Sequence, residues 1–295
     1  MPGLTVPGAV PALSLRTPSV RWTPSGLQVR DEPLAEEAPL TIEIGYRRGA
    51  QPVVRLLATT MRTPGNDDEL ALGFLHAEGL IAELADVAGS TALEENCRGE
   101  AIATLRVELT QPPSEDFARI SRSLLTSSAC GLCGRPGLQG LPLGRKAPEF
   151  SPASHRWRPE LVAELPEMLR AVQVDFERTG GSHAAGLAGP CGRRLLLVRE
   201  DVGRHNAVDK VVGAALRTGM PLAGQALVLS GRASFELLQK AAAAGIELVV
   251  AVGAPSSLAL RLAHEANITL VGFARAGRFN LYTHASRLAV RCPAP

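Results

Sequence analysis

The sequence lacks the features of a secreted or membrane-bound chain. Its 295 residues include only five cysteines, too few and too unevenly spaced for a disulfide scaffold. No apolar run approaches the ~20 residues needed to cross a bilayer. The first residues have no base before Arg16, and their apolar stretch is broken by Pro7 and Pro11, so we expect no signal peptide there. We therefore expect a cytoplasmic protein with reduced thiols and no membrane partner.

The chain also lacks a dominant charge. Lysine and arginine number 31 against 29 aspartate and glutamate, which gives a formal net charge of +2. Nothing in this balance calls for a nucleic-acid partner, so any anion site must be local. Neither a Walker motif nor a dinucleotide-binding G-x-G-x-x-G is present. Hydrophobic residues make up 45% of the chain, enough to bury the core of one large domain or two small ones.

Apolar periodicity and proline content predict four segments. Seven prolines lie in the first 40 residues, so this region should be extended and weakly ordered. The segments are a proline-rich arm (1–30), a strand-rich N-terminal domain (31–120), a mobile glycine-rich loop (121–157) and an α/β domain (158–295).

Two strands and a helix are predicted early in the N-terminal domain. Apolar residues alternate with polar ones from Leu40, and a second apolar run covers 53–57, which indicates half-buried strands. Asn66 followed three residues later by Glu69 is typical of a capped helix start, and Gly79 marks the end of that helix. Another alternating strand follows at 105–109.

The second half of the chain alternates between short apolar runs and amphipathic stretches. A helix over 159–178, kinked at Pro166 and ended by Gly180 and Gly181, precedes them. Strands alternating with helices predict a layered α/β sheet with parallel content, which binds ligands where strands end. The runs are 195–198, 226–229, 248–252 and 268–273, and the stretches are 204–217, 233–244 and 256–266.

A cysteine pair, Cys130-Gly-Leu-Cys133, lies in the predicted loop. Structural zinc would need further ligands, which Cys97 and Cys191 could supply. Dithiol–disulfide exchange normally uses this spacing at a helix start in a thioredoxin-like unit. Sulfur relay needs an accessible thiolate, and the flanking arginines 122 and 135 could lower its pKa. Inert cysteines in a turn are the remaining alternative.

Basic and hydroxyl side chains follow several predicted strands. Backbone N–H groups at helix starts are unpaired, so such turns can bind phosphate, and several on one sheet favour a nucleotide-like ligand. Alternatively, His183 is a loop residue, and the 200–210 segment is a capped helix start with Lys210 on a solvated face. The candidate residues are His183, Arg204, His205, Ser230, Gly231 and Arg232, the serines of Gly253-Ala-Pro-Ser-Ser257, and the segment Phe273 to Arg278.

These motifs together resemble the FdhD/NarQ family, the formate dehydrogenase accessory sulfurtransferases, from about residue 31 to 285. The motifs are Ser-Ser-Ala-Cys130-Gly-Leu-Cys133-Gly, Gly-Gly-Ser-His183, Glu-Asp-Val-Gly-Arg-His205-Asn-Ala-Val-Asp-Lys210, Ser-Gly-Arg232 and Gly-Phe-Ala-Arg-Ala-Gly-Arg278. The resemblance implies a cytoplasmic factor that takes sulfur from a cysteine desulfurase. It passes this sulfur to the molybdenum or tungsten bis-molybdopterin guanine dinucleotide cofactor of formate dehydrogenase.

The resemblance also implies roles for particular residues. Cys130 would carry the persulfide and Cys133 would accept or release the sulfur. The segment Phe273-Ala274-Arg275-Ala276-Gly277-Arg278 would bind the guanine dinucleotide. Family members are expected to be homodimers without a resident metal, and their C-terminal half is similar to the cytidine deaminase fold.

Two other functions remain open. A chaperone could hold and insert the cofactor without transferring sulfur. A zinc-dependent deaminase would need H-x-E followed by P-C-x-x-C, and this sequence lacks that arrangement.

Overall fold

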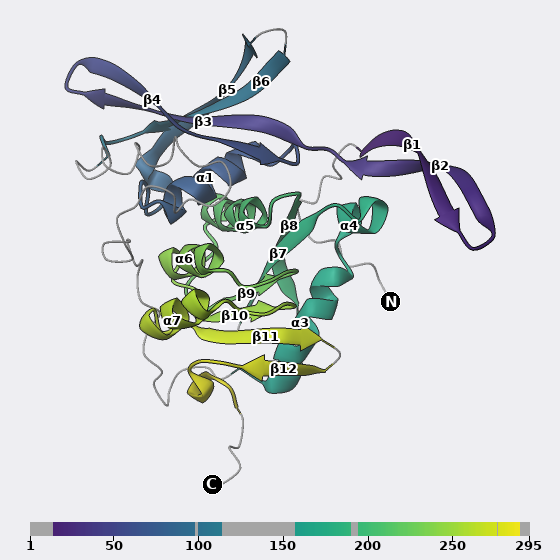
Figure 1. Cartoon of the computed structure of the whole chain (residues 1–295). Coiled ribbons are helices and arrows are strands. Elements are labelled where there is room, and N and C mark those ends of the chain that lie inside the picture. The colour runs from purple at the N-terminus through teal and green to yellow at the C-terminus, as the bar shows by residue number, and fades with distance from the viewer. Residues whose placement is uncertain (1–13, 98–99, 114–156, 190–193, 276, 290–295) are drawn as a thin grey trace.

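The computed structural model describes residues 14–97, 100–113, 157–189, 194–275 and 277–289. Their strands form a two-stranded, a four-stranded and a six-stranded sheet. Helices pack between the two larger sheets and on the outer face of the six-stranded one (Figure 1). The mixed α/β class expected from the sequence is thus confirmed.

An antiparallel hairpin of β1 (Ser14–Thr23) and β2 (Gly26–Ala35) projects from the body (Figure 1). The expected extended conformation is confirmed for residues 14–30, but the expected weak order is wrong there, because these strands pair along their whole length. The cross-strand pairs Val20–Val29 and Trp22–Leu27 leave all four side chains exposed near the tip. With no buried face, the hairpin shows little of the alternation that predicts strands.

The N-terminal unit, which we define as β3 to β6 with α1, is a four-stranded sheet covered by one helix. The strand order is β4-β3-β6-β5, with β3 and β6 parallel and the outer pairs antiparallel. Alternating residues such as Ile42, Ile44 and Val107 point inward and pack against Leu70 and Leu75 of the helix. The bounds are β3 (Ala38–Arg48), β4 (Gln51–Arg62), α1 (Asp67–Ala77), β5 (Val87–Cys97) and β6 (Glu100–Leu109).

The C-terminal unit, from α3 to β12, contains the six-stranded sheet in the order β12-β11-β10-β9-β7-β8. Strands β9, β10 and β11 are parallel, whereas β7, β8 and β12 run antiparallel to their neighbours. The strands are β7 (His183–Ala188), β8 (Leu195–Asp201), β9 (Ala226–Leu229), β10 (Leu248–Ala251), β11 (Thr269–Arg275) and β12 (Arg278–Leu281). The helices linking them are α5 (Arg204–Thr218), α6 (Phe235–Ala243) and α7 (Ser257–Glu265).

This sheet is buried on both faces. One face packs against α5, α6 and α7, and the other packs against α3 and Trp157. Burial on both sides explains why its strands appear in the sequence as continuous apolar runs. The alternation of strands and helices expected from residue 195 onward is therefore confirmed.

The predicted helix over 159–178 is wrong as a single element. It is divided into α3 (Pro159–Arg170) and α4 (Val174–Thr179), with Pro166 inside α3 rather than at the division. Gly180, in the left-handed conformation at φ 67°, ends α4. His183 is not in a loop, because it begins β7.

The two larger units meet where α1 crosses α5. A β-carbon on Gly73 would overlap the backbone carbonyl of Asp209, and one on Gly213 would overlap that of Glu69. The two glycines therefore let the helix backbones touch, which no larger residue would permit.

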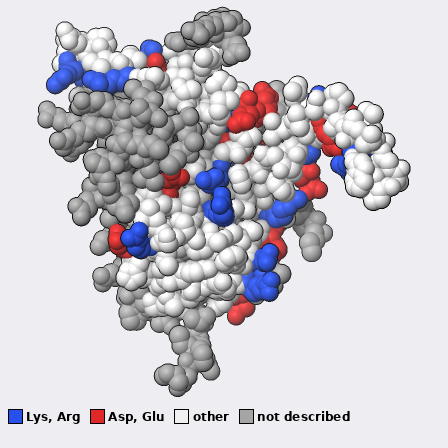
Figure 2. Space-filling view, in the orientation of Figure 1, with Lys and Arg blue, Asp and Glu red and all other residues white. Residues whose placement is uncertain are grey.

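Charged side chains on the face shown in Figure 2 form small separate groups amid uncharged surface. No helix among the described residues combines the length and apolar character required of a membrane span.

Candidate functional site

Three parallel strands end together at one edge of the six-stranded sheet, and their following residues are linked by backbone hydrogen bonds. Gly253 N donates to Gly231 O at 2.9 Å, and Phe273 N donates to Gly253 O at 3.1 Å. A β-carbon on Gly253 would lie 3.0 to 3.1 Å from Arg232. These turns form a continuous main-chain floor, and the Ser-Gly-Arg232, Gly253 and Phe273 motifs lie at strand ends of one sheet, as expected.

The floor continues to β7 through Ser230. Its hydroxyl accepts a hydrogen bond from Ala184 N at 2.9 Å, and its own N–H donates to Ala184 O at 3.0 Å. Gly231 packs against the His183 ring: a β-carbon on Gly231 would lie 3.6 Å from the ring atoms Cε1 and Nδ1. The structure thus brings together His183 and the Ser-Gly-Arg turn, which are far apart in sequence.

A pocket of about 510 Å³ opens beside this floor. Its walls combine strand-end residues with residues from α3, α4 and the turn after α4. Much of the lining is apolar, as at Phe176, Val202 and Val252, and Glu167 adds an acidic group. The polar and basic lining residues are Arg170, Gln173, Ser182, His183, Ser230 and Arg275.

Phe273 has an unusual backbone conformation beside this pocket. Its φ of 52° lies in the left-handed region, which is unfavourable for a bulky residue, and its ring is 43% exposed. The pairing of β11 with β12 is irregular between Gly272 and Arg275. Strain of this kind is concentrated at functional sites, so Phe273 is a candidate ligand contact.

The other residues of the 273–278 segment differ in exposure. Ala274 is fully buried in the core, so its side chain is structural. Arg275, Gly277 and Arg278 are exposed, whereas Ala276 lies outside the described residues.

The pKa of His183 lies below its ordinary value of 6.5. Burial lowers it most, the positive charges of Arg204 and His205 lower it further, and Asp201 opposes them. Asp201 is also the residue paired with His183 across β7 and β8. The His183 imidazole therefore takes up a proton less readily than a free histidine side chain does.

Arg204 and His205 form the first turn of α5. His205 Nε2 lies 2.7 Å from Glu236 Oε2 at the start of α6. Arg204 Nε and Ser234 Oγ are enclosed and have no hydrogen-bond partner among the described residues. An unpaired enclosed donor costs free energy unless a ligand accepts from it, so Arg204 remains a candidate anion contact.

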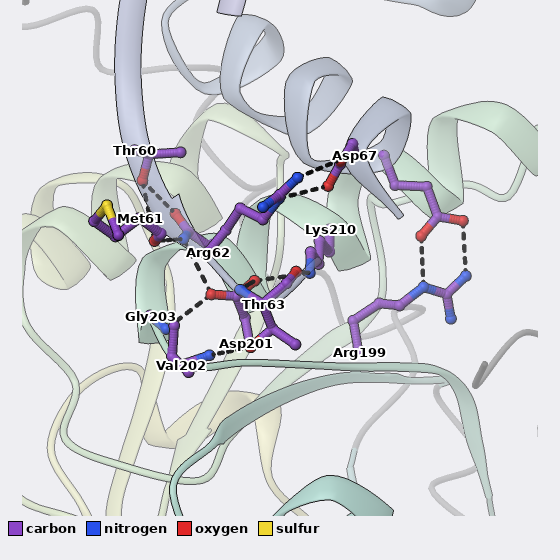
Figure 3. Close-up of polar contacts among 12 residues, drawn as sticks. Thr60, Met61, Arg62, Thr63, Asp67, Arg199, Asp201, Val202, Gly203 and Lys210 are labelled. Atoms are coloured by element: carbon purple, nitrogen blue, oxygen red, sulfur yellow. Dashed lines mark hydrogen bonds and ion pairs between the residues drawn. The ribbon is translucent and has the colours of Figure 1, made fainter. Parts of the chain in front are cut away.

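The rest of the 200–210 segment binds the N-terminal unit (Figure 3). Asp201 accepts hydrogen bonds from Gly203 N at 2.8 Å, Asn206 Nδ2 at 3.0 Å and Thr63 N at 3.1 Å, and it pairs with Lys210 Nζ at 2.7 Å. Lys210 is not on a solvated face: its side chain is 2% exposed and also donates to Thr63 O. The alternative that residues 200–210 are only a capped helix start with Lys210 on a solvated face is wrong, because the N-terminal unit covers this side of α5.

A second buried ion pair joins the units further along β8. Arg199 binds Glu69 through two hydrogen bonds of 2.5 and 2.8 Å (Figure 3). Glu69 is therefore not part of a capping box, and Asn66, at φ 57°, makes no side-chain cap. The polar start of α1 instead serves contacts with Arg199 and, through Asp67, with Arg62.

Glu200 was not expected as a site residue, yet it supports one wall of the pocket. Its carboxylate accepts from Asp175 N at 2.7 Å, Phe176 N at 2.9 Å and Ser182 Oγ at 2.8 Å. Burial raises the pKa of Glu200, and these hydrogen bonds oppose the increase. The sequence gives no indication of this role, because the partners lie 18 to 25 residues away.

Cys130 and Cys133 lie outside the described residues, so their proposed roles stay predictions. Within the described ranges, no group of three or more histidine, cysteine, aspartate or glutamate side chains is arranged to hold a metal ion.

The fold and the site define a mixed α/β protein with a pocket at the carboxyl edge of its parallel strands, lined by apolar residues together with Arg170, His183 and Arg275. Residues 35–289 match the FdhD/NarQ family, and the chain belongs to this family.

Named relatives agree with this assignment. The chain is 44% identical over 281 residues to "Sulfur carrier protein FdhD" of Streptomyces coelicolor, covering 92% of this chain and 94% of that protein. It is 45% identical over 269 residues to the protein of that name in Mycobacterium tuberculosis, covering 88% and 92%. A crystal structure described as a formate dehydrogenase accessory protein from Desulfotalea psychrophila superposes with a TM-score of 0.65 at 26% identity, covering 94% of this chain and all of that one.

Proposed function

We propose that this protein is a cytoplasmic sulfur carrier that passes persulfide sulfur from a cysteine desulfurase to the bis-molybdopterin guanine dinucleotide cofactor of a formate dehydrogenase. The observation that carries the proposal is the 44% identity, over 92% of the chain, to a protein named as a sulfur carrier. The metal of the acceptor is molybdenum or tungsten. The homodimer expected from the family is part of this proposal.

The sulfur step is assigned to Cys130. Its thiolate attacks the outer sulfur of the desulfurase persulfide, the S–S bond breaks, and the desulfurase cysteine leaves as a thiolate. Cys130 then holds the outer sulfur as a persulfide. On delivery Cys130 returns to a thiolate, and the acceptor supplies the electron pair of the new bond to sulfur. Cys133 is the second thiol that accepts or releases the sulfur.

The strand-end pocket is assigned to the guanine dinucleotide, which is a substrate here rather than a resident group. Two arginines suit a polyanion: Arg275 lines the pocket, and Arg204, whose charge acts on the pocket residue His183, has an enclosed nitrogen without a partner among the described residues. Phe273 presents an exposed ring on which a base could stack. His183 and Ser230 supply hydrogen-bonding groups on the pocket floor.

Mass spectrometry of the peptide containing Cys130 and Cys133 tests the sulfur step. The protein is incubated with a cysteine desulfurase and free cysteine, and thiols are trapped by alkylation. The expected result is one added sulfur on Cys130 that is absent from Cys130→Ser and retained in the control Cys97→Ser. No added sulfur under conditions where a known acceptor gains it would refute the relay.

The second candidate is an insertion chaperone, supported by a pocket that would bind the same cofactor without any cysteine. A Cys130→Ser variant separates the two functions. A chaperone would still activate formate dehydrogenase with this variant, whereas a sulfur carrier would not.

A further inference from the structure

The 200–210 segment contains two groups that cannot touch a ligand. The side chains of Asp201 and Lys210 are 0% and 2% exposed, and both lie beneath the first turn of α5. A buried ion pair is weak evidence for stability alone, since two well-packed apolar residues often serve as well. The arrangement of their partners indicates a more specific role.

Asp201 joins three parts of the chain through one carboxylate. Its Oδ1 accepts from Gly203 N and Asn206 Nδ2, which set the start of α5. Its Oδ2 accepts from Thr63 N and pairs with Lys210 Nζ. Every donor is directed at a fixed charge, so the carboxylate holds the turn between β8 and α5 in one orientation (Figure 3).

Thr63 fixes the same turn from the other unit. Besides its N–H bond to Asp201, its Oγ1 accepts from Val202 N at 3.0 Å and its carbonyl accepts from Lys210 Nζ at 2.8 Å. Asn206 adds a hydrogen bond to Met61 O at 2.8 Å. The end of β4 and residues 201–206 are therefore one connected polar unit.

Arg204 and His205 lie directly after the turn that Asp201 and Thr63 hold, in the first turn of α5. Gly203, the residue before them, has no side chain with which to cap α5, and its N–H donates to Asp201 Oδ1. A β-carbon on Gly203 would lie 2.9 Å from Asn206 Nδ2, so a larger residue here would press on the side chain that Asp201 holds.

We propose that Thr63, Asp201 and Lys210 are positioning residues that make the N-terminal unit part of the nucleotide site, by fixing where Arg204 and His205 stand. This inference rests on the proposed function, because it assumes that the strand-end pocket binds a guanine nucleotide. None of the three residues contacts the ligand, so their effect on affinity acts through the α5 turn.

The Glu69–Arg199 pair provides a matched control. It is also buried, also joins the two units and also contains two short hydrogen bonds. It joins β8 to the first turn of α1, and its hydrogen bonds involve no residue of the 201–206 turn. Loss of this pair should weaken the interface without moving Arg204.

The experiment measures GDP affinity by calorimetry and melting temperature by calorimetric scanning on the full chain. Thr63→Val removes only the acceptor of Val202 N, and Asp201→Asn replaces an acceptor with an amide donor facing Thr63 N. We expect both variants to bind GDP about tenfold more weakly, since small misplacements of binding groups have effects of this size or larger. Thr63→Ser, which keeps the hydroxyl, should restore affinity.

Glu69→Gln should lower the melting temperature while its GDP affinity stays within about twofold of wild type. Unchanged affinity in Thr63→Val, or an equal loss of affinity in Glu69→Gln, would overturn the positioning role while leaving the nucleotide site intact. If the wild-type protein does not bind GDP, the nucleotide site of the proposed function fails, and the positioning role fails with it. If Asp201→Asn does not fold, the GDP affinity of Thr63→Val still tests the positioning role.

Discussion

Lys210→Met is expected to be among the most destabilising single substitutions in the C-terminal unit. Lys210 Nζ lies 2.7 Å from Asp201 Oδ2 and donates to Thr63 O at 2.8 Å, in a place where neither charged side chain is more than 2% exposed. Methionine preserves much of the volume but leaves a buried carboxylate without its cation and a carbonyl without its donor.

The expected loss is about 3 to 5 kcal/mol, the usual effect of removing one partner from a buried ion pair. A domain is typically stable by ~5 to 15 kcal/mol, so this single change would remove a large part of the total. The double variant Asp201→Asn with Lys210→Met should recover at least about 1 kcal/mol, because no uncompensated charge remains.

Urea denaturation followed by tryptophan fluorescence measures this loss. Trp157 is 1% exposed in the core of the C-terminal unit, whereas Trp22 is 72% exposed on the hairpin. A Trp22→Phe background therefore makes the signal specific to Trp157. A loss below about 1 kcal/mol for Lys210→Met, or a double variant no more stable than the single one, would refute the electrostatic argument.

Lys240→Met is the matched control for this comparison. Lys240 pairs with Asp209 at 2.7 Å but its side chain is 12% exposed. Burial raises the pKa of Asp209, so this carboxyl takes up a proton more readily once the lysine is lost. We therefore expect a smaller loss than for Lys210→Met, and an equal or larger one would contradict the ranking by burial.

Three further predictions concern the helix contact and the site. Gly213→Ala should cost about 1 to 3 kcal/mol in thermal denaturation, because its β-carbon meets a backbone carbonyl, whereas the exposed Gly89→Ala should be neutral. The lowered pKa of His183 means that its contribution to stability is complete above pH 6.5 and is lost as pH falls below that value. The melting temperature of His183→Gln should therefore rise relative to wild type below pH 6.5, and a constant difference would contradict this. Phe273→Gly should be about 1 kcal/mol more stable than Phe273→Ala, since only glycine adopts φ 52° without a β-carbon penalty, while both weaken GDP binding.

Regular patterns in the sequence were sufficient to predict most strands and helices of the C-terminal unit. Apolar runs such as 226–229 and 248–252 are bounded by turn residues, so both the strands and the following helices could be placed. β7 was missed because its residues after His183 are mostly alanine and glycine, which are small and show no alternation. The hairpin of residues 14–35 was missed because neither of its faces is buried, so its apolar and polar residues do not alternate as they do in a half-buried strand.

Local sequence patterns indicated some of the residues that line the pocket, but not the residues whose surroundings depend on distant contacts. Basic and hydroxyl residues after strands indicated a pocket, and His183, Ser230 and Arg275 do line one. Lys210 could not be recognised as buried, because Thr63, the residue that encloses it, lies 147 positions away. Glu200 was overlooked for the same reason.

The main-chain floor formed by Gly231, Gly253 and Phe273 has a consequence for engineering. Its hydrogen bonds join backbone groups, so they do not depend on the identity of the side chains at neighbouring surface positions. Exposed residues such as Arg232 and Arg278 can therefore be replaced to alter the charge presented at this edge of the sheet while the backbone beneath them keeps its hydrogen bonds.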